Sequence, residues 1–364
     1  MILTKRERFL KALRNQSSDE LVWAPNFDYW LAVNRAEGTM PGKYADMSRN
    51  DIVRSIGGYI WNRAGGIRTE HDPSVREVQR SEGDAVIYEL HTPVGMVRQV
   101  QKKTEGEHRS RFLAEHFVKD LDSLAVMKYV VEATHCEPDY APTVQALRET
   151  GDDGIVLNGY GCVPFIQFAK NDAGYVNGFY MWTDHKAEVD ALIDAHTKLF
   201  LQGCSVLADG PCDVIATGDN MDGVMISPDI FKEYAIPFYQ EAGRICSAKG
   251  KIFQGHWCGR TQSLLGITPG CGLDVVEAVV TEPMADITLS HALDLLRGEV
   301  VLQGGVPSVL VCAEGGSSDD FERYIDEVVL PLRGRAGFIL GMSDNVPPNA
   351  DFSRVEAIAD MIRS

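Results

Sequence analysis

The chain has 364 residues, of which 45% are hydrophobic and 24% charged, the composition of a globular protein. Its formal net charge of −17 argues against nucleic-acid binding, which requires a basic surface. The sequence contains no run of about 18 apolar residues and no signal-peptide pattern at its start, so we expect no membrane span and a cytoplasmic protein with reduced cysteines.

Apolar runs along the chain predict β-strands. Most of them are continuous rather than alternating, as in strands that are buried on both faces of a parallel sheet. In chain order these runs are residues 21–27, 85–90 with 94–100, 154–160, 212–218, 251–255, 273–280, 300–305 and 337–342.

Helical patterns fall between the strand-like runs. Segments 4–7 and 353–356 each match a capping box ahead of an apolar stripe, which predicts a helix start at each place. In the segment 226–245, Ser227 fits the N-cap and Pro228 fits the first helical position. Because strands alternate with helices, the sequence predicts βαβ units.

An α/β chain of this kind forms either an open doubly wound sheet or a closed barrel. No G-x-G-x-x-G pattern follows a strand, so the dinucleotide-binding type of open sheet loses its main support. About eight strand-like runs favour a TIM barrel. We therefore predict a single (β/α)8 barrel domain over residues 1–364, with a helical and hairpin elaboration near the N terminus.

Polar residues follow several of the predicted strands, where the reactive groups of a TIM barrel lie. They are Asn158, Asp219, Asn220, His256, Cys258, Glu277 and Asp344. His256 and Cys258 stand two positions apart, so in a strand their side chains point the same way, and both residue types bind zinc. Glu277 and Asp344 end two other strand-like runs and are the further donors that a catalytic zinc needs.

These residues also have structural interpretations. His256 fits a buried core histidine, and Cys258 fits a small buried hydrophobe. Glu277 and Asp344 fit carboxylates that pair with Lys or Arg, and the pair Asp344-Asn345 is typical of a turn.

The order of motifs around Asp219 to Cys258 is more specific than an H-x-C pattern alone. It reads "GDNMDGVMISPDIFKEYAIPFYQEAGRICSAKGKIFQGHWCG": an acidic turn, an S-P-x-x-F-x-E/K helix start and a strand that ends in H-x-C-G. This order resembles the uroporphyrinogen decarboxylase superfamily. The resemblance continues through residues 300–311 and 337–358, and it is weak before about residue 210.

That superfamily has two broad branches. Its decarboxylases hold the tetrapyrrole carboxylates with paired arginines near the N terminus, whereas the corresponding stretch here reads "APNFDYWLAVNRAEG". The sequence is more similar to the zinc-dependent, corrinoid-linked methyltransferases, which include O-demethylase components and methylcobalamin:coenzyme M enzymes. The coenzyme M enzymes carry a third cysteine near the final strand, where this chain has Asp344.

The expected ligand set favours chemistry at oxygen. Zinc held by one thiolate, one imidazole and carboxylates is a harder Lewis acid than zinc held by several thiolates. Such an ion stabilises a leaving phenolate. The resemblance therefore implies transfer of a methyl group from a methoxylated aromatic to a Co(I) corrinoid, with His256, Cys258 and Glu277 as zinc ligands and Asp344 as a fourth candidate.

The corrinoid is expected on a separate partner protein. A D-x-H-x-x-G signature would supply its lower ligand, but the partial match at Asp194 to His196 has Leu199 where glycine is needed. Asp219 and Asn220 are the expected catalytic residues. The residues expected to line the substrate pocket are Asn26, Tyr29, Trp30 and Asn158.

Four alternatives stay open at this point. The chain fits a decarboxylase of the same superfamily, a transferase to a thiol, or a transferase to a folate. It also fits a non-catalytic barrel in which zinc is only structural. The oligomeric state is open as well, with a homodimer as one expectation.

Overall fold

The computed structural model describes residues 3–17, 20–104 and 111–363. The chain divides into two compact units. The first comprises Met1–Gly66, Tyr140–Gly159 and Pro211–Ser364, and the second comprises Ile67–Asp139 and Tyr160–Gly210. The single domain over residues 1–364 stays a prediction.

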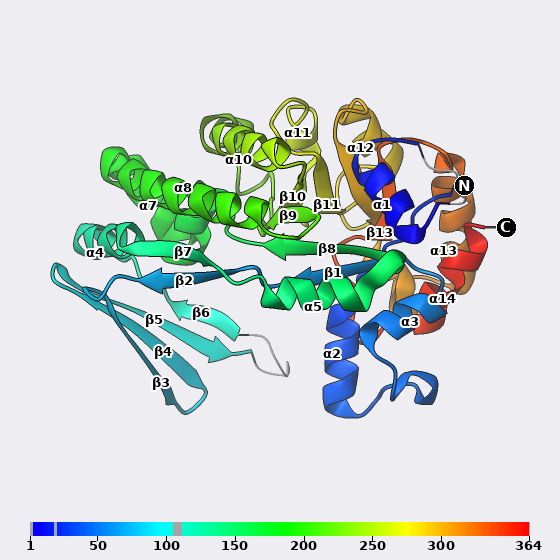
Figure 1. The fold of residues 1–364 in the computed structure, drawn as a ribbon, viewed down its shortest axis with the longest axis horizontal. Helices are drawn as coiled ribbons and strands as arrows, with labels where there is room; N and C mark the ends of the chain where they lie inside the picture. Colours follow the sequence, from blue (N-terminus) through cyan, green and yellow to red (C-terminus); the bar gives the residue numbers. More distant parts are fainter. Residues whose placement is uncertain (1–2, 18–19, 105–110, 364) are drawn as a thin grey trace. The chain divides into compact units, whose positions relative to one another are not determined.

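A seven-stranded parallel sheet forms the centre of the first unit (Figure 1). Its strands, in spatial order, are β1 (Ile60–Ala64), β8 (Gly154–Gly159), β9 (Val214–Thr217), β10 (Ile252–His256), β11 (Val275–Val279), β12 (Val301–Val306) and β13 (Phe338–Met342). Parallel neighbours require crossover connections, and between successive strands from β9 to β13 the chain forms helices.

Helices of the first unit occupy these crossovers and the chain ends. They are α1 (Lys5–Leu13), α2 (Asp28–Glu37), α3 (Arg49–Ser55), α5 (Ala141–Thr150), α9 (Pro228–Ile230), α10 (Ile236–Ala248), α11 (Gln262–Leu265), α12 (Leu289–Leu295), α13 (Ser318–Tyr324) and α14 (Phe352–Met361). In Figure 1, α10, α11 and α12 lie along the outer side of β9, β10 and β11.

The two edge strands of this sheet are joined through residues 22–24. Trp23 forms an isolated parallel bridge with Leu340 of β13, and its carbonyl oxygen accepts a 2.7 Å hydrogen bond from the amide of Tyr59, next to β1. The predicted strand over 21–27 is thus reduced to a bridge, because Pro25 has no N–H to extend the ladder. The α/β class and the parallel sheet are confirmed, with seven strands rather than the expected eight.

Strand alternation builds the core of the first unit. The inward positions near the amino ends of six of the seven strands are apolar and almost fully buried, and they form one cluster: Ile155, Val214, Ile252, Val275, Val301 and Ile339. Trp61 of β1, which lies opposite Ile155, and Leu157, which is one inward step further along β8, belong to the same cluster. On four of the strands the next inward positions carry polar side chains, and the candidate site lies at this end; the four residues are Arg63, Gln254, Glu277 and Gln303.

Two of the predicted helix starts are confirmed. Thr4 caps α1: its hydroxyl accepts from the Glu7 amide, and its own amide donates to the Glu7 carboxylate, which completes a capping box. The Ser227 hydroxyl accepts from the amide of Ile230 at the start of α9. The predicted cap at Ser353 is wrong by two residues. The carboxylate of Asp351 accepts a 3.2 Å hydrogen bond from the Ser353 amide, so Asp351 is the N-cap and α14 begins at Phe352.

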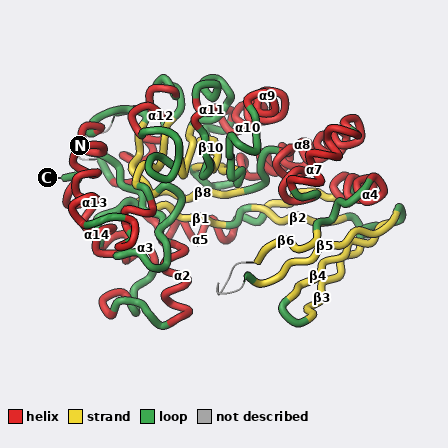
Figure 2. The backbone as a smooth tube through the Cα atoms, turned by 180° about the vertical axis from the view of Figure 1, so that it is seen from behind, coloured by secondary structure: helices red, strands yellow, loops and turns green. Residues whose placement is uncertain are grey.

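The second unit contains an antiparallel sheet of four strands, which lie side by side in Figure 2. They are β3 (Arg76–Glu82), β4 (Ala85–Thr92), β5 (Gly95–Lys103) and β6 (Arg111–Glu115). The runs 85–90 and 94–100 form the β4–β5 hairpin, so they belong to this antiparallel sheet and not to the parallel one. The unit also contains the strand pair β2 (Ile67–His71) and β7 (Thr134–Pro138), and the helices α4 (Leu121–Glu132), α6 (Pro164–Ile166), α7 (Tyr175–Asp184) and α8 (Lys186–Asp209).

Among the described residues, no helix combines the length and the apolar character that a bilayer crossing requires. The partial corrinoid signature lies inside α8. There the imidazole Nε2 of His196 lies 2.7 Å from a carboxylate oxygen of Asp172, and both side chains are buried.

Candidate metal centre

Three of the predicted ligands converge at the carboxyl ends of β10 and β13. The side chains of His256, Cys258 and Asp344 each offer one ligand atom, and these atoms all lie within 4.8 Å of one another. The imidazole Nε2 of His256 is 3.7 Å from Oδ1 of Asp344. Ligand atoms on a tetrahedral zinc ion are about 3.3–3.8 Å apart, given bonds of roughly 2.0–2.3 Å. The group could therefore bind zinc with small side-chain adjustments.

The backbone at this end of the sheet is held in uncommon conformations. In the described part of the chain, five non-glycine residues have positive φ, and three of them are Asn220 (47°), Ala278 (65°) and Asp344 (77°). Asn220 follows β9, Ala278 follows Glu277 in β11, and Asp344 follows β13. Such conformations cost free energy and concentrate at functional sites, so their grouping here supports a site.

The H-x-C-G turn depends on its glycine. A Cβ atom on Gly259 would lie 2.6 Å from the carbonyl oxygen of Met221 and 2.5 Å from Cβ of Asp222. Only glycine permits this close approach, which brings the segment after β10 against the segment after β9. The turn thereby fixes the backbone position of Cys258.

Glu277 contacts the other nitrogen of His256. The two residues lie directly opposite each other in the β10–β11 ladder, and Oε2 of Glu277 is 2.6 Å from Nδ1 of His256. The Glu277 side chain is only 3% exposed. A carboxylate on the remote nitrogen fixes the tautomer and the ring orientation of a metal-binding histidine. Glu277 thus lies behind His256, outside the group of three that could hold the ion.

The surroundings of His256 favour a positive charge on its ring. Burial alone would lower the pKa of His256, but hydrogen bonding with Cys258 and with Glu277 outweighs burial and raises that pKa to about 10. Burial also raises the pKa of Asp344, while the charges of His256 and Arg63 oppose that shift. An environment that stabilises a proton on His256 stabilises a metal cation at the same place.

Asp344 is anchored from both sides. The side-chain amide of Asn26 donates a 2.6 Å hydrogen bond to the backbone oxygen of Asp344. The side-chain amide of Asn345 donates a 2.7 Å hydrogen bond to Oδ2 of Asp344. The Ser308 hydroxyl, near β12, lies 2.6 Å from the Asn345 carbonyl oxygen. These contacts leave Oδ1 directed at His256. Asn26 was expected to line the substrate pocket, and its observed contact is with the Asp344 loop.

The two expected catalytic residues lie in different surroundings. Asp219 is fully buried, and its carboxylate accepts 2.7 Å hydrogen bonds from the hydroxyls of Thr217 and Tyr239. Burial, together with the Asp219 charge, raises the pKa of Tyr239 well above its usual value. Asn220 is exposed and lines the cavity described below. The catalytic roles of both residues stay predictions.

Of the three other expected pocket residues, two have contacts of their own and one is exposed. Trp30 is buried and stacks on Phe352, with ring centroids 3.9 Å apart. Asn158 is buried and donates hydrogen bonds to the Ala64 carbonyl oxygen and the Thr143 hydroxyl. Tyr29 is 36% exposed on α2. None of these contacts involves the candidate ligands, and the substrate roles of these residues stay predictions.

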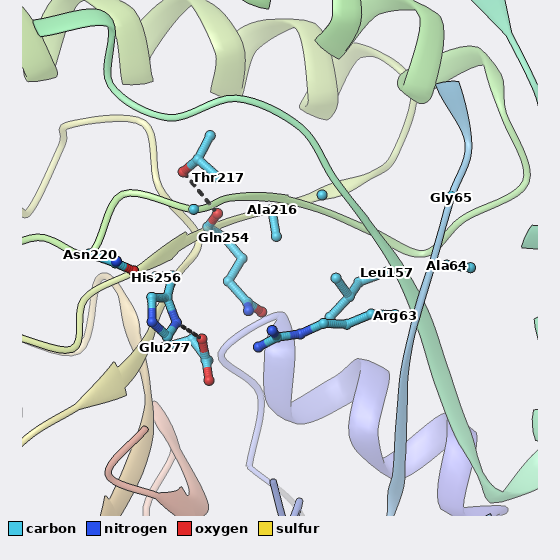
Figure 3. Close-up of a pocket in the computed structure, with 12 residues that line it drawn as sticks. Arg63, Ala64, Gly65, Leu157, Ala216, Thr217, Asn220, Gln254, His256 and Glu277 are labelled. Carbon is cyan, nitrogen blue, oxygen red and sulfur yellow. Dashed lines mark hydrogen bonds and ion pairs between the residues drawn. The ribbon is translucent and has the colours of Figure 1, made fainter. Parts of the chain in front are cut away.

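A cavity of about 460 Å³ opens beside His256 and Glu277. Its volume is within the range of small-molecule sites. The side chains of Arg63, Gln254 and His256 extend into the same space (Figure 3). Sequence reasoning missed Arg63, although a signal exists. Trp61 is a core residue of β1, so a side chain two positions later points to the same interior.

The sequence profile of the uroporphyrinogen decarboxylase (URO-D) family matches residues 114–364. The chain belongs to the uroporphyrinogen decarboxylase family. The matched region contains His256, Cys258, Glu277 and Asp344, whereas Arg63 lies before it. No curated protein sequence matches the chain.

Two solved structures illustrate how similar this fold is to known folds. The chain is similar to a methyltransferase from Methanosarcina mazei, with 14% identity and a TM-score of 0.62, over 100% of this chain and 99% of that chain. A D-psicose 3-epimerase from Clostridium cellulolyticum H10 matches with 12% identity and a TM-score of 0.36, over 62% of this chain and 83% of that chain. At these identities the first likeness concerns the fold.

Proposed function

We propose that the protein is a zinc-dependent methyltransferase that moves a methyl group from a methoxylated aromatic to the corrinoid of a partner protein. The observation that carries the proposal is the convergence of His256, Cys258 and Asp344 beside a cavity of small-molecule size. Three protein ligands leave a fourth position for a guest, which is the pattern of catalytic rather than structural zinc.

The donor set supports chemistry at oxygen. It contains one sulfur, one nitrogen and one carboxylate oxygen, and in the described chain no second cysteine belongs to the group. Zinc bound there would act as a Lewis acid that stabilises the departing phenolate. The bond between the methyl carbon and oxygen breaks and leaves its electron pair on oxygen, while the carbon takes its new bonding pair from the Co(I) corrinoid.

The chain's own residues prepare the site for this transfer. Glu277 orients the His256 ring through Nδ1 and leaves Nε2 for the ion. Asn26 and Asn345 hold the strained Asp344 in place, so its Oδ1 is positioned before the substrate arrives. Asn220 presents a carboxamide at the cavity wall, where it would contact the donor.

The similar fold of the Methanosarcina mazei methyltransferase over the whole chain supports the same class of reaction. Family membership also supports a second candidate, a decarboxylase. That reaction needs cationic side chains for several carboxylates, but Arg63 is the sole arginine or lysine among the twelve described residues that line the cavity. Transfer from a methylcorrinoid to a thiol is a third candidate, which a zinc site with several thiolates would favour.

The test combines metal analysis with turnover. Purified protein should contain about one zinc per chain. It should release phenol from methoxylated aromatics in the presence of a reduced corrinoid protein, and chelation should stop the reaction. Carbon dioxide release from a porphyrinogen, or turnover that persists without zinc, would contradict the proposal.

A further inference from the structure

We propose that the methyl donor is an anion, an aromatic carboxylate whose charged group pairs with Arg63 at the wall of the cavity. This inference rests on the proposed function, because it names the substrate class of the same site. Three features of the first unit support it: the direction of the Arg63 side chain, its lack of an ion partner, and an unsatisfied carboxamide oxygen beside it.

Strand geometry directs Arg63 inward. Arg63 lies opposite Leu157 in the β1–β8 ladder, and both residues line the cavity. Two positions earlier, Trp61 belongs to the interior apolar cluster. The guanidinium is 4.7 Å from the centroid of the Trp61 ring. Stacking on an indole uses the face of a guanidinium and leaves its N–H edge free to bind a carboxylate with two hydrogen bonds.

Arg63 has no carboxylate partner within ion-pair distance among the residues that the structure describes. Other arginines of the first unit do have one: Arg6 pairs with Asp213, and Arg49 pairs with Asp28. The charge of Arg63 reaches Asp344 only at longer range, where it opposes the rise of the Asp344 pKa. Its donor edge is therefore available to a ligand.

A second group beside Arg63 lacks a partner. Gln254 is 1% exposed and lines the cavity, and its Oε1 is buried without a hydrogen-bond partner in the described protein. Figure 3 shows its carboxamide and the Arg63 guanidinium directed into the same space. Leaving a buried polar atom unpaired costs free energy, so a ligand with polar atoms is expected there.

The cavity and the site beside it thus offer two kinds of group to a ligand. The candidate zinc ligands would bind an oxygen, and Arg63 would pair with an anion. A methoxylated aromatic carboxylate carries both groups on one ring. A neutral methoxyarene would leave Arg63 and Gln254 without new partners.

The test measures binding rather than turnover. Zinc-loaded wild-type protein is titrated calorimetrically with 4-methoxybenzoate and with 4-methoxybenzamide, which has nearly the same shape but no charge. We expect the benzoate to bind at least roughly tenfold more tightly, the scale of a hydrogen bond to a charged group. R63Q should reduce this ratio to about one, R63K should give an intermediate ratio, and both variants should keep wild-type zinc content.

Arg244 provides the matched control, because it is an exposed arginine of α10 that pairs with Glu241 on the same helix. R244Q should keep the wild-type preference for the benzoate. Equal affinities for the two ligands in the wild type, a preference that survives R63Q, or no measurable binding of either ligand would overturn the inference. Tight, Arg63-dependent binding without methyl transfer would instead overturn the proposed function alone.

Discussion

The two ends of the seven-stranded sheet are built from the same strands but differ in chemistry. Near the amino ends, the inward side chains are aliphatic and fully packed, as with Ile252 and Ile339. Four residues later on β10, the inward position is His256, and beyond β13 the chain turns to Asp344. Three residues with positive φ lie at the polar end. The strands thus provide stability at one end and reactivity at the other.

This division has a physical basis. The apolar layer gains stability from burial, which tolerates no unpaired polar group. The polar end holds ionisable groups and strained backbone, and both cost stability. Since the two layers are separate, substitutions should affect either the metal and the reaction or the fold.

The largest effect is expected for Cys258→Ser. Serine removes the one sulfur donor of the group, so zinc content and methyl transfer should both fall by more than about 100-fold, beyond the effect of losing an outer partner. The unfolding midpoint should change little. The buried thiol Cys271 is the control, and C271S should keep its zinc. A C258S enzyme that is fully active after chelation would contradict the zinc site.

Ile339→Ala should have the opposite profile. Ile339 is fully buried in the apolar layer, and its truncation should lower the free energy of unfolding by about 2–5 kcal/mol. Zinc stoichiometry of the folded protein should stay at the wild-type value. Chemical denaturation and metal analysis on the same sample measure both quantities. Loss of zinc from folded I339A would show that the two layers are coupled.

Glu277→Gln should weaken zinc binding by about 10–100-fold without removing a ligand. The amide still fits opposite His256, but it no longer supplies the charge that holds the Nδ1 proton. A competition titration with a chromophoric chelator measures the change. If E277Q loses zinc as completely as C258S does, Glu277 is a ligand rather than a support.

Asn26→Ala should have the smallest effect, a weakening of zinc binding of roughly fivefold, which corresponds to one hydrogen bond. Its side chain supports the Asp344 backbone and does not belong to the group of candidate ligands. The same competition titration applies. If zinc affinity stays unchanged and the methyl donor binds more weakly, Asn26 lines the substrate pocket, as the sequence predicted, and does not support the metal site.

Sequence reasoning found strands that lie in mainly apolar runs, such as β10, β11 and β13. It missed β1, because the run from Ile60 to Ala64 is interrupted by Asn62 and Arg63 and lies between glycine pairs. The missed strand carried the missed residue, Arg63. A strand that ends in a cation at the cavity does not match the apolar pattern used to detect buried strands.

His256 and Asp344 were predictable because each stands just after an apolar run, and Cys258 was predictable because it stands two positions after His256. Their relations were not. Glu277 contacts Nδ1 of His256 because the register of β10 and β11 places the two residues opposite each other. This register depends on how the two strands pair, so it cannot be derived from the sequence of either strand alone. The burial of Asp219 under Tyr239 likewise depends on how α10 packs against β10. Position after a strand therefore indicates nearness to the site but does not give the direction of a side chain.

The central claim is that zinc binds to one imidazole, one thiolate and one carboxylate with room for a guest. Zinc K-edge X-ray absorption on the loaded protein tests it directly. The account predicts a single sulfur ligand at about 2.3 Å, with the remaining ligands nitrogen or oxygen, and a change in the oxygen shell when 4-methoxybenzoate is added. Two or more sulfur ligands, or a spectrum that no ligand alters, would contradict it.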